Sequence, residues 1–386
     1  MPKNLGKTPP MGWNSWNTFS WNIDENLIKG AADAMVETGL KDAGYEYVVI
    51  DDCWSLKDRD ENGRLVPDPK KFPNGIKAVA DYVHSKGLKF GIYSCAGTHT
   101  CANHPGSFEH EFQDAETFAS WGVDFLKYDY CFKPKGIPGE ILYRRMSMAL
   151  RNCGREILFS ACNWGNDGVH DWIRNTGAQM FRSTGDIQDT WNSIKNLALS
   201  QLNMRQSQAG VYCWNDIDML VVGMSGKSDN SWIAEGGFGC TTEEYRTHFS
   251  LWAMMNSPLM IGCDIRNMTT ETKEILTNKD VIAINQDPEG RGPIEIDHWC
   301  NESCKGLVKP LENGDYAILL VNFADGEHPA QFSFNFWDMG LPYASGYALE
   351  FYDVWNHKTV GTFKERYCTD LKPHCCEMFR VKLVKA

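Results

Sequence analysis

The sequence lacks the marks of several protein classes. No apolar run approaches the ~18 residues that a membrane-spanning helix needs, and the first residues, Met1 to Lys7, contain no apolar stretch of the kind found in a signal peptide. No HExxH or HxH motif of a metal hydrolase, no GxSxG nucleophile turn and no phosphate-binding loop occurs. Basic residues are outnumbered by acidic ones, 38 to 50, and the net charge of −12 argues against nucleic acid or an anionic membrane as a partner.

Aromatic side chains, by contrast, are plentiful. Trp, Tyr and Phe make up 12% of the 386 residues, which supplies many rings to line a pocket. The length is about twice that of a usual single domain, so we expect one large domain and one smaller domain. The apolar fraction of 42% and the charged fraction of 23% are those of an ordinary soluble enzyme.

Fourteen cysteines are many for a cytosolic protein, yet no CxxC pair occurs, and the chain is too long to need disulfides for its stability. Structural thiols or a disulfide explain the densest group best. A zinc site is the alternative, although the spacing matches no familiar set of zinc ligands. This group consists of Cys300, Cys304, Cys368, Cys375 and Cys376, with His374 beside it.

Eight short apolar segments alternate with helical patterns over nearly 300 residues. One helix is predicted from Leu27 to Thr38, with Asp24 as its N-cap and Gly39 near its end. This alternation is typical of a (β/α)8 barrel, a TIM barrel, which we assign to residues 1–298. A doubly wound sheet is the alternative, but the glycine-rich turn of that fold is missing after the first strand. The predicted strands are 10–13, 47–50, 90–93, 125–129, 157–162, 180–182, 211–214 and 259–262.

From about Cys300 the pattern changes to strands without helices between them. Turn pairs such as Asn313-Gly314 and Ser345-Gly346 separate these strands. We therefore predict an antiparallel β domain over residues 299–386 that covers part of the outside of the barrel. Its predicted strands are 316–323, 331–336, 347–354 and 378–384.

In a (β/α)8 barrel, residues at the carboxyl ends of the strands point into one shared mouth. Here those ends carry several aspartates, one Lys, one Arg and several aromatic residues. Carboxylates accept hydrogen bonds from sugar hydroxyls, and aromatic rings cover the apolar C–H face of a pyranose. A sugar pocket is therefore predicted, and two of its aspartates could form the carboxylate pair of a glycosidase. The strand-end residues are Trp16, Asp51, Asp52, Tyr93, Lys127, Asp129, Cys162, Trp164, Arg182, Asp186, Asp216 and Asp218.

Most of these residues, taken one at a time, also have a structural explanation. A strand-end Asp is more often a helix N-cap than a catalyst, and a lone Trp, Tyr or Cys is more often part of the core. Lys127 and Asp129 are different, because residues two apart on a strand share a face. A buried charge without partners is costly, so this pair favours a functional role.

Six motifs in order along the chain carry a family likeness: MGWNSW at 11–16, IDDCW at 50–54, GIYS at 91–94, KYD at 127–129, RSTGD at 182–186 and WNDIDM at 214–219. Together they resemble the signatures of the α-galactosidase and α-N-acetylgalactosaminidase family of retaining glycoside hydrolases (glycoside hydrolase family 27, melibiase-like). The likeness extends from about residue 8 to 292, whereas the C-terminal domain matches only in general character.

The resemblance implies a (β/α)8 barrel followed by a C-terminal antiparallel β-sandwich, with no metal and no organic cofactor. It gives Asp129 the role of nucleophile and Asp186 that of acid/base, and it makes Asp51 and Asp52 ligands of O4 and O6 of the sugar. The other substrate-binding residues that the resemblance implies are Trp16, Tyr93, Cys101, Lys127, Cys162, Asn163, Trp164, Arg182, Asp218 and Met219.

These roles require opposite protonation states in the two catalytic aspartates. Asp129 must be ionised to attack the anomeric carbon, and Asp186 must hold a proton for the leaving oxygen. We expect Lys127 to lower the pKa of Asp129. We also expect a dry setting and the charge of Asp129 to raise the pKa of Asp186.

The sequence departs from the family pattern at its cysteines. Trp21 stands where many members carry a cysteine that pairs with the position of Cys53, so that disulfide cannot form. The resemblance implies that Cys101 and Cys131 keep the other common disulfide. The missing bridges, together with the missing signal peptide, lead us to expect a cytoplasmic location.

A second departure bears on the substrate. Cys162-Asn163-Trp164-Gly165 replaces the Cys-Glu-Trp-Gly of galactosidase-like relatives, whereas animal N-acetylgalactosaminidases carry small residues in this loop. Trp164 favours galactose, while Asn163 could bind either O2 or an acetamide group. Asp52 indicates a sugar with a C6 hydroxyl and argues against the arabinopyranosidase members.

We therefore predict an exo-acting, retaining α-galactosidase that releases terminal α-linked galactose from oligosaccharides or glycoconjugates by double displacement. An α-N-acetylgalactosaminidase on the same scaffold is the alternative. A non-catalytic galactose-binding protein is disfavoured, because Asp129 and Asp186 are both present. The expected partner is a small carbohydrate, and the acidic surface is compatible with a monomer or a homo-oligomer.

Overall fold

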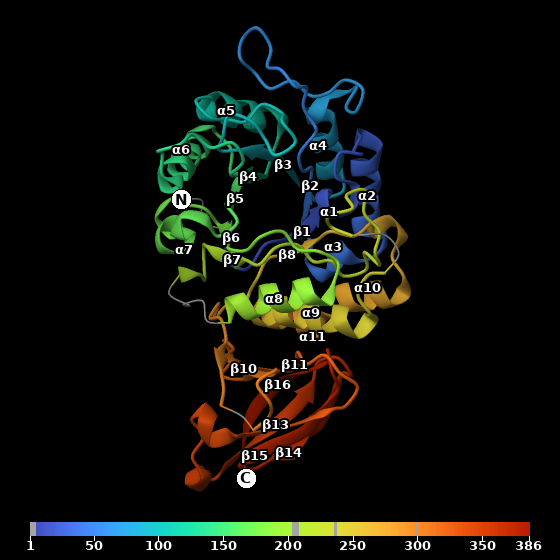
Figure 1. The fold of residues 1–386 in the computed structure, drawn as a ribbon, viewed down its shortest axis with the longest axis vertical. Coiled ribbons are helices and arrows are strands. Elements are labelled where there is room, and N and C mark those ends of the chain that lie inside the picture. The colour runs from blue at the N-terminus through green and yellow to red at the C-terminus, as the bar shows by residue number, and fades with distance from the viewer. Residues whose placement is uncertain (1–4, 203–207, 235–237, 298) are drawn as a thin grey trace.

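A computed structural model describes residues 5–202, 208–234, 238–297 and 299–386. Its larger part is a barrel of parallel strands ringed by helices, and a β-sandwich lies beneath helices α8, α9 and α11 (Figure 1). No helix in the described ranges is long and apolar enough to cross a membrane. The helices are α1 (Trp16–Phe19), α2 (Glu25–Glu37), α3 (Leu40–Ala43), α4 (Gly75–Ser85), α5 (Glu111–Trp121), α6 (Gly139–Asn152), α7 (Val169–Trp172), α8 (Trp191–Gln201), α9 (Thr242–Met254), α10 (Thr270–Leu276) and α11 (Lys279–Asn285).

The parallel strands form one sheet that closes on itself. The strands are β1 (Met11–Asn14), β2 (Tyr47–Val49), β3 (Lys89–Cys95), β4 (Phe125–Asp129), β5 (Leu158–Cys162), β6 (Met180–Arg182), β7 (Trp214–Asp216) and β8 (Leu259–Ile261). Their order is β7-β6-β5-β4-β3-β2-β1-β8. Leu220, just after β7, closes the ring, because its N–H donates to Met260 O (2.7 Å) and its carbonyl accepts from Gly262 N (2.9 Å). The predicted (β/α)8 barrel is confirmed.

The local signals that predicted helix α2 also hold. The side chain of Asp24 accepts a hydrogen bond from Leu27 N (2.7 Å) and so caps the first turn. Gly39 follows the helix with a φ of 83°, a conformation that suits glycine, and lets the chain turn back toward β2.

The seventh strand was predicted too early. The residues Val211–Cys213 form a tight turn instead, in which Tyr212 has a φ of 72° and is 48% exposed, and only Trp214 of the predicted run belongs to β7. The strand itself carries the buried polar residues Asn215 and Asp216. Asn215 is tied by its Nδ2 to Gln201 Oε1 (3.0 Å), so a tertiary contact allows a polar strand that hydropathy did not reveal.

The C-terminal part is the predicted antiparallel β-sandwich. One sheet has the strand order β14-β13-β16-β11-β10-β9, and a second sheet pairs β12 with β15. Besides the four predicted strands, the unit contains β9, β10, β14 and β15. The strands are β9 (Ile294–Glu295), β10 (Cys304–Pro310), β11 (Tyr316–Asn322), β12 (Ala330–Asn335), β13 (Tyr347–Asp353), β14 (Lys358–Phe363), β15 (Arg366–Leu371) and β16 (Cys376–Lys385).

The start of the second domain stays a prediction, because residue 298, the predicted last residue of the barrel domain, lies outside the described residues. Strand β9, which precedes that position, already pairs antiparallel with β10. The C-terminal sheet therefore includes residues that we assigned to the barrel.

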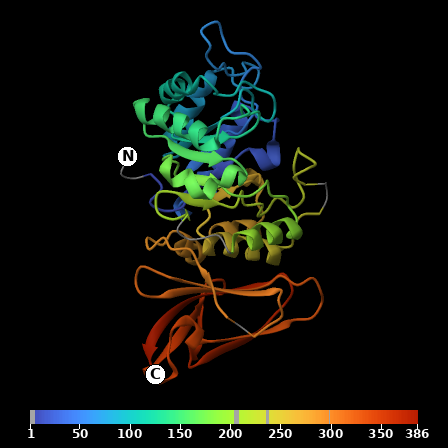
Figure 2. The same cartoon turned by 60° about the vertical axis from the view of Figure 1, so that its left-hand side comes forward.

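The larger sheet of the sandwich packs on the barrel through one of its faces. On β11, Ala317, Leu319 and Val321 join the core of the barrel, while Ile318 and Leu320 join the core of the sandwich. This division follows from the alternation of side chains along a strand. Figure 2 shows the sandwich against the helical layer at one end of the molecule.

The late cysteine group does not form a zinc site among the described residues. Cys300 and Cys304 are joined in a disulfide, and the other three cysteines are free. The two ring nitrogens of His374 lie 2.7 Å from Glu244 Oε1 and 3.1 Å from Asp325 Oδ1. The histidine thus helps to join the sandwich to α9 instead of binding a metal.

Candidate active site

One cavity at the carboxyl ends of the barrel strands collects the predicted site residues. About 490 Å³ of space between its walls is free of protein atoms, part of it open to solvent. Its lining is rich in carboxylates and aromatic rings, as the strand ends predicted. The lining residues are Trp16, Asn17, Asp51, Asp52, Tyr93, Cys101, Lys127, Asp129, Cys162, Trp164, Arg182, Asp186, Asp218, Met219 and Ile233.

Two strand-end residues do not line this cavity. Asn163, predicted as a substrate ligand, is fully buried, and its Nδ2 donates to Asn166 O (2.7 Å) within its own turn. Asp216 is also buried, and its Oδ1 accepts a hydrogen bond from Asp218 N (2.9 Å). The prediction for Asn163 is thus corrected, because its side chain is used to form the turn after β5 that carries Trp164.

The prediction missed two lining residues, Asn17 and Ile233. Asn17 directly follows the first motif, three residues after the end of β1, and its position near a strand end was a signal that could have found it. Its Nδ2 is buried and has no hydrogen-bond partner in the described part of the chain. Ile233 lies in the long segment after β7, where no strand or helix pattern marks the residues that reach the cavity.

Asp51 lies at the end of β2 and is held by two donors. Lys127 Nζ donates to Asp51 Oδ2 at 2.8 Å, and Asn14 Nδ2 donates to the same oxygen at 2.7 Å. We expected Lys127 to stabilise Asp129 directly, but its hydrogen bond goes to Asp51, which follows β2, two strands away from its own strand β4. The two donors hold the Asp51 carboxyl in one orientation at the cavity wall, where its oxygens can accept hydrogen bonds from sugar hydroxyls.

Asp52 faces the cavity from the next position and is held by backbone donors. Ala102 N donates to Asp52 Oδ2 (3.0 Å), and Cys53 N donates to Oδ1 (2.6 Å). Burial raises the pKa of Asp52 in spite of these donors. The side chain is thus fixed in place before any ligand binds, an arrangement that favours selective recognition.

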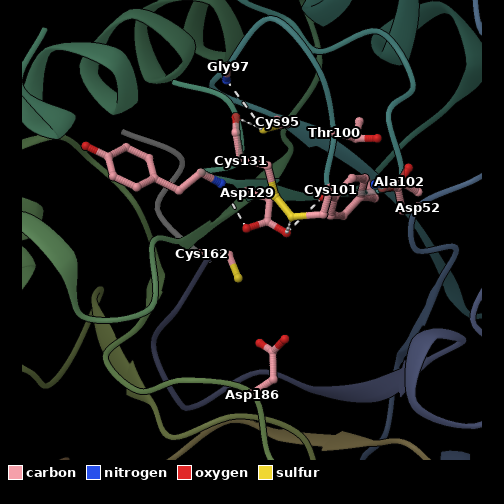
Figure 3. Close-up of a disulfide and its surroundings, with 12 residues drawn as sticks. Asp52, Cys95, Gly97, Thr100, Cys101, Ala102, Asp129, Cys131, Cys162 and Asp186 are labelled. Atoms are coloured by element: carbon pink, nitrogen blue, oxygen red, sulfur yellow. Dashed lines mark hydrogen bonds between the residues drawn. A yellow bond between two sulfur atoms is a disulfide. The ribbon is translucent and has the colours of Figure 1, made fainter. Parts of the chain in front are cut away.

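Asp129 ends β4, and its carboxyl group faces Asp186 (Figure 3). Tyr93 OH donates to Oδ2 and Tyr130 N donates to Oδ1, both at 2.8 Å. Cys101 Sγ lies 3.9 Å from Oδ2. These contacts fix the carboxylate in one orientation, as a nucleophile requires.

The pKa of Asp129 nevertheless differs from our expectation. Burial raises it to about 6, although the charge of Lys127 and the hydrogen bonds from Tyr93 and Tyr130 act in the opposite direction. The carboxyl is only 6% exposed, and the ammonium of Lys127 is bonded to Asp51. Desolvation therefore outweighs the favourable charge.

Asp186 lies after β6 and is bound by a neighbouring cation. Arg182 Nη2 donates to Asp186 Oδ1 (2.8 Å), and Arg182 Nη1 donates to Asp218 Oδ1 (2.6 Å). The guanidinium is buried, whereas the Asp186 side chain is 44% exposed at the opening of the cavity. One arginine thus fixes two carboxylates at the wall opposite Asp129.

Arg182 reverses the expected pKa of Asp186. Burial by itself raises the pKa, but the charge and the hydrogen bond of Arg182, together with the charge of Lys127, outweigh it, and the pKa is lowered from 3.8. Burial raises the pKa of Asp218 to about 6. In the empty site the expected order of the Asp129 and Asp186 pKa values is therefore inverted.

The carboxyl groups of Asp129 and Asp186 point toward one another across open space (Figure 3). Both line the same cavity, and the charge of Asp186 contributes to the raised pKa of Asp129. A glycosidic bond placed between them would have a nucleophile on one side and a proton donor on the other. This is the arrangement that carboxylate-pair glycosidases use.

Two groups of side chains among the described residues have the spacing of metal ligands. In the first, with Asp52, Cys53 and His104, burial and the charge of Asp52 raise the pKa of Cys53 to about 12, so the thiol keeps its proton. In the second, Cys101 and Cys131 are joined in a disulfide, which leaves Asp129 as the only anionic ligand. Neither donor set suits a divalent ion, since metal binding requires a deprotonated thiol.

A second hollow of similar size lies near the start of β7. Trp214, Asn215 and Asn256 contribute to its wall, and none of the described residues that line it has an ionisable side chain. It lacks the groups that acid–base or nucleophilic chemistry needs, so the cavity around Asp129 is the candidate active site.

The cysteines near the cavity follow the predicted departures from the family pattern. Cys101 and Cys131 form a disulfide, and Cys53 is a buried free thiol. Trp21, which stands at the position of the missing partner, is 50% exposed. The disulfide that the resemblance implied is thus confirmed.

Comparisons with known proteins agree with the fold and the site. Residues 8–287 match the family model described as alpha galactosidase A, and residues 303–381 match the alpha galactosidase C-terminal beta sandwich domain. The α-galactosidase of Cyamopsis tetragonoloba is 44% identical over 382 residues, which cover 97% of this chain and 86% of that protein.

Solved structures show the same likeness. The crystal structure of α-galactosidase I from Mortierella vinacea superposes with a TM-score of 0.89 at 36% identity, covering 99% of this chain and 98% of the other. The α-galactosidase of Saccharomyces cerevisiae, whose structure contains raffinose, gives a TM-score of 0.89 at 30% identity, with 98% of both chains covered. Both domains are thus matched, and the chain belongs to the α-galactosidase family of glycoside hydrolases.

Proposed function

We propose that the protein is an exo-acting, retaining α-galactosidase that releases terminal α-linked galactose from oligosaccharides or glycoconjugates. The opposed carboxyl groups of Asp129 and Asp186 in one cavity carry this proposal. In the first step, Asp129 attacks the anomeric carbon while Asp186 gives a proton to the leaving oxygen. In the second step, Asp186 takes a proton from water, which displaces Asp129 and restores both groups.

Substrate binding has to free Asp186 from Arg182 before the first step. In the empty site the shared proton resides mainly on Asp129, because burial raises the pKa of that group while Arg182 lowers the pKa of Asp186. A hydroxyl group of the substrate that accepts a hydrogen bond from Arg182 would weaken its bond to Asp186. The proton can then move to the carboxyl that must donate it.

The sugar ring would be held by the remaining wall. We infer that Asp51 and Asp52 bind O4 and O6, and that Trp16, Tyr93 and Trp164 cover the apolar parts of the ring. The other proposed contacts are Cys101, Lys127, Cys162, Arg182, Asp218 and Met219, all of which line the cavity.

Galactose is a better candidate than N-acetylgalactosamine on one specific observation. Asn163, which could have received an acetamide group, does not reach the cavity, and the ring of Trp164 contributes to the wall from the next position. The large indole of Trp164 leaves less room beside C2 of the sugar than the small residues that animal N-acetylgalactosaminidases carry in the same loop.

Specificity is the ratio of kcat/KM values, so the two sugars are compared directly. We expect kcat/KM for 4-nitrophenyl α-galactoside to exceed that for 4-nitrophenyl α-N-acetylgalactosaminide by about 100-fold or more, the discrimination that a steric clash can supply. Equal values, or a preference for the acetamido sugar, would establish the alternative. Trp164→Ala is the matched variant and should narrow the difference.

The remaining inferences about partners rest on composition. The excess of acidic residues supports a neutral carbohydrate as the partner and disfavours nucleic acid and anionic membranes. A homo-oligomer is compatible with this surface. The cytoplasmic location stays a prediction, and the disulfides Cys101–Cys131 and Cys300–Cys304 count against it, because disulfides are rare in that compartment.

A further inference from the structure

Asn17 and Ile233 line the cavity but have no role in the proposed binding of galactose. They lie more than 200 residues apart in the sequence, yet the segments that carry them are joined. Ser228 Oγ donates to Asn17 O (2.5 Å), and Asp229 N donates to Thr18 O (2.8 Å). The two residues therefore belong to one continuous part of the wall.

Residues 228–233, which we call the rim segment, run from α1 to the loop that carries Asp186. At the far end, Gln188 Nε2 donates to Trp232 O (2.7 Å), and Asp189 N donates to Ile233 O (3.0 Å). Gln188 follows Asp186 by only two positions. Because both of its ends are tied down, the rim segment is fixed in place beside Asp186 in the empty protein.

The rim segment carries a large aromatic side chain where solvent reaches it. Trp232 is 53% exposed, while its neighbour Ile233 is 2% exposed and lines the cavity. An exposed tryptophan beside a polar cavity is a common way to cover the C–H face of a sugar.

Asn17 supplies the polar part of the same wall. Asn17 is only 3% exposed, and its side-chain Nδ2 has no hydrogen-bond partner among the described residues. A buried donor without an acceptor is costly, so a ligand hydroxyl at this position would be bound favourably.

We propose that Trp232, Ile233 and Asn17 form a subsite for the sugar unit to which galactose is attached. The inference rests on the proposed function, in which Asp186 protonates the leaving oxygen, so the leaving group must lie on the side of Asp186. The rim segment occupies that side and leads outward from it. An aromatic face combined with a free N–H suits a sugar and not a wholly apolar leaving group, so the substrates are oligosaccharides.

The test compares two substrates that differ only beyond the galactose unit. Melibiose carries a glucose as its leaving group, whereas α-galactosyl fluoride releases only fluoride and cannot occupy the subsite. We expect Trp232→Ala to lower kcat/KM for melibiose about tenfold, the effect of losing about 1.4 kcal/mol of ring contact, and to leave kcat/KM for the fluoride within about twofold. Trp232→Phe should restore most of the loss.

Two control variants complete the design. Trp337, which is 62% exposed on the sandwich, provides a matched control. Trp337→Ala should leave kcat/KM unchanged for both melibiose and α-galactosyl fluoride. Phe132, which is 59% exposed, follows Cys131 on the side of Asp129. Phe132→Ala should affect melibiose less than Trp232→Ala does.

Three results would overturn the subsite. They are an unchanged kcat/KM for melibiose in Trp232→Ala, an equal loss for both substrates, and a larger loss in Phe132→Ala than in Trp232→Ala. Failure of the proposed function looks different, because the wild-type protein would then hydrolyse neither melibiose nor the fluoride.

Discussion

The pH dependence of kcat/KM follows from the inverted pKa values of the two catalytic carboxyls. Burial raises the pKa of Asp129 to about 6, and Arg182 lowers the pKa of Asp186 below 3.8. Between these values the pair holds one proton, which resides mainly on Asp129. Hydrolysis needs the same single proton, but on Asp186. The value of kcat/KM, which describes the reaction of free enzyme with free substrate, is therefore proportional to the population of the one-proton state of the enzyme.

The proton has to move against its preference before the first step. Burial favours the proton on Asp129, and the guanidinium of Arg182 disfavours it on Asp186, so the reactive arrangement is the less populated of the two one-proton states. Binding of the substrate at Arg182 has to offset this difference. The inversion reduces the absolute rate but leaves the pH range of activity set by the two pKa values of the pair.

The assay is kcat/KM for melibiose, whose leaving oxygen needs the proton, from about pH 3 to pH 8, with far-UV circular dichroism to confirm that the protein stays folded. We expect the highest values between about pH 4 and pH 6 and a tenfold fall per pH unit above about 6, as the single proton is lost. A profile that rises through pH 6 and stays high above it would refute the inversion, because Asp129 would then act as a base whose ionisation limits the rate.

Three further predictions concern substitutions. Asp129→Asn and Asp186→Asn should each lower kcat for melibiose by about 10³-fold or more without unfolding the protein, and full activity in either variant would contradict its assigned role. Asp52→Ala should lower kcat/KM for an α-galactoside at least about tenfold, yet change it little for the β-L-arabinopyranoside, which lacks C6. An equal loss on both substrates would show that Asp52 does not bind O6. Lys309 lies on β10, is 1% exposed and donates through its Nζ to Ala253 O of α9. Burial lowers the pKa of its ammonium group to about 7. The unfolded chain therefore binds one more proton between about pH 7 and 10.5, and stability should rise with pH across that window. Lys309→Met should remove this rise and stabilise the protein at pH 6 by up to about 5 kcal/mol in denaturant unfolding, whereas a less stable variant would contradict the buried-charge explanation.

The sequence revealed the barrel and most of its site because the physics of this fold is local and repetitive. Parallel strands are buried on both faces and read as short apolar runs, and residues at their carboxyl ends must meet. Asp51, Asp129 and Asp218 could therefore be placed in one cavity from their positions alone. The shift of β7 shows where this reasoning stops, since Asn215 is buried only because Gln201 accepts its hydrogen bond.

The charge pattern of the site could not be predicted in the same way. Lys127 lies two residues from Asp129, yet it donates to Asp51, which follows β2, two strands away in the barrel. Arg182 reaches both Asp186 and Asp218, which come from different loops. These pairings depend on the register between strands and on the course of the loops, which the spacing of residues along the chain does not determine.

One strand that the prediction missed in the sandwich, the edge strand β14, has a similar cause. β14 is largely exposed, and its residues Lys358–Phe363 show no apolar alternation. It is held by pairing with β13, whose own residues are more buried. An edge strand of this kind is defined by its neighbour's hydrogen bonds and leaves little trace in the sequence.

The division of roles between the two aspartates is tested most directly by trapping the covalent intermediate. The protein is incubated with a fluorinated galactosyl fluoride that forms the glycosyl-enzyme faster than water releases it, and the labelled peptide is identified by mass spectrometry. We predict one galactosyl group on Asp129, in the peptide that contains Lys127-Tyr128-Asp129. A label on Asp186, or release of the inverted sugar without any label, would contradict the assignment.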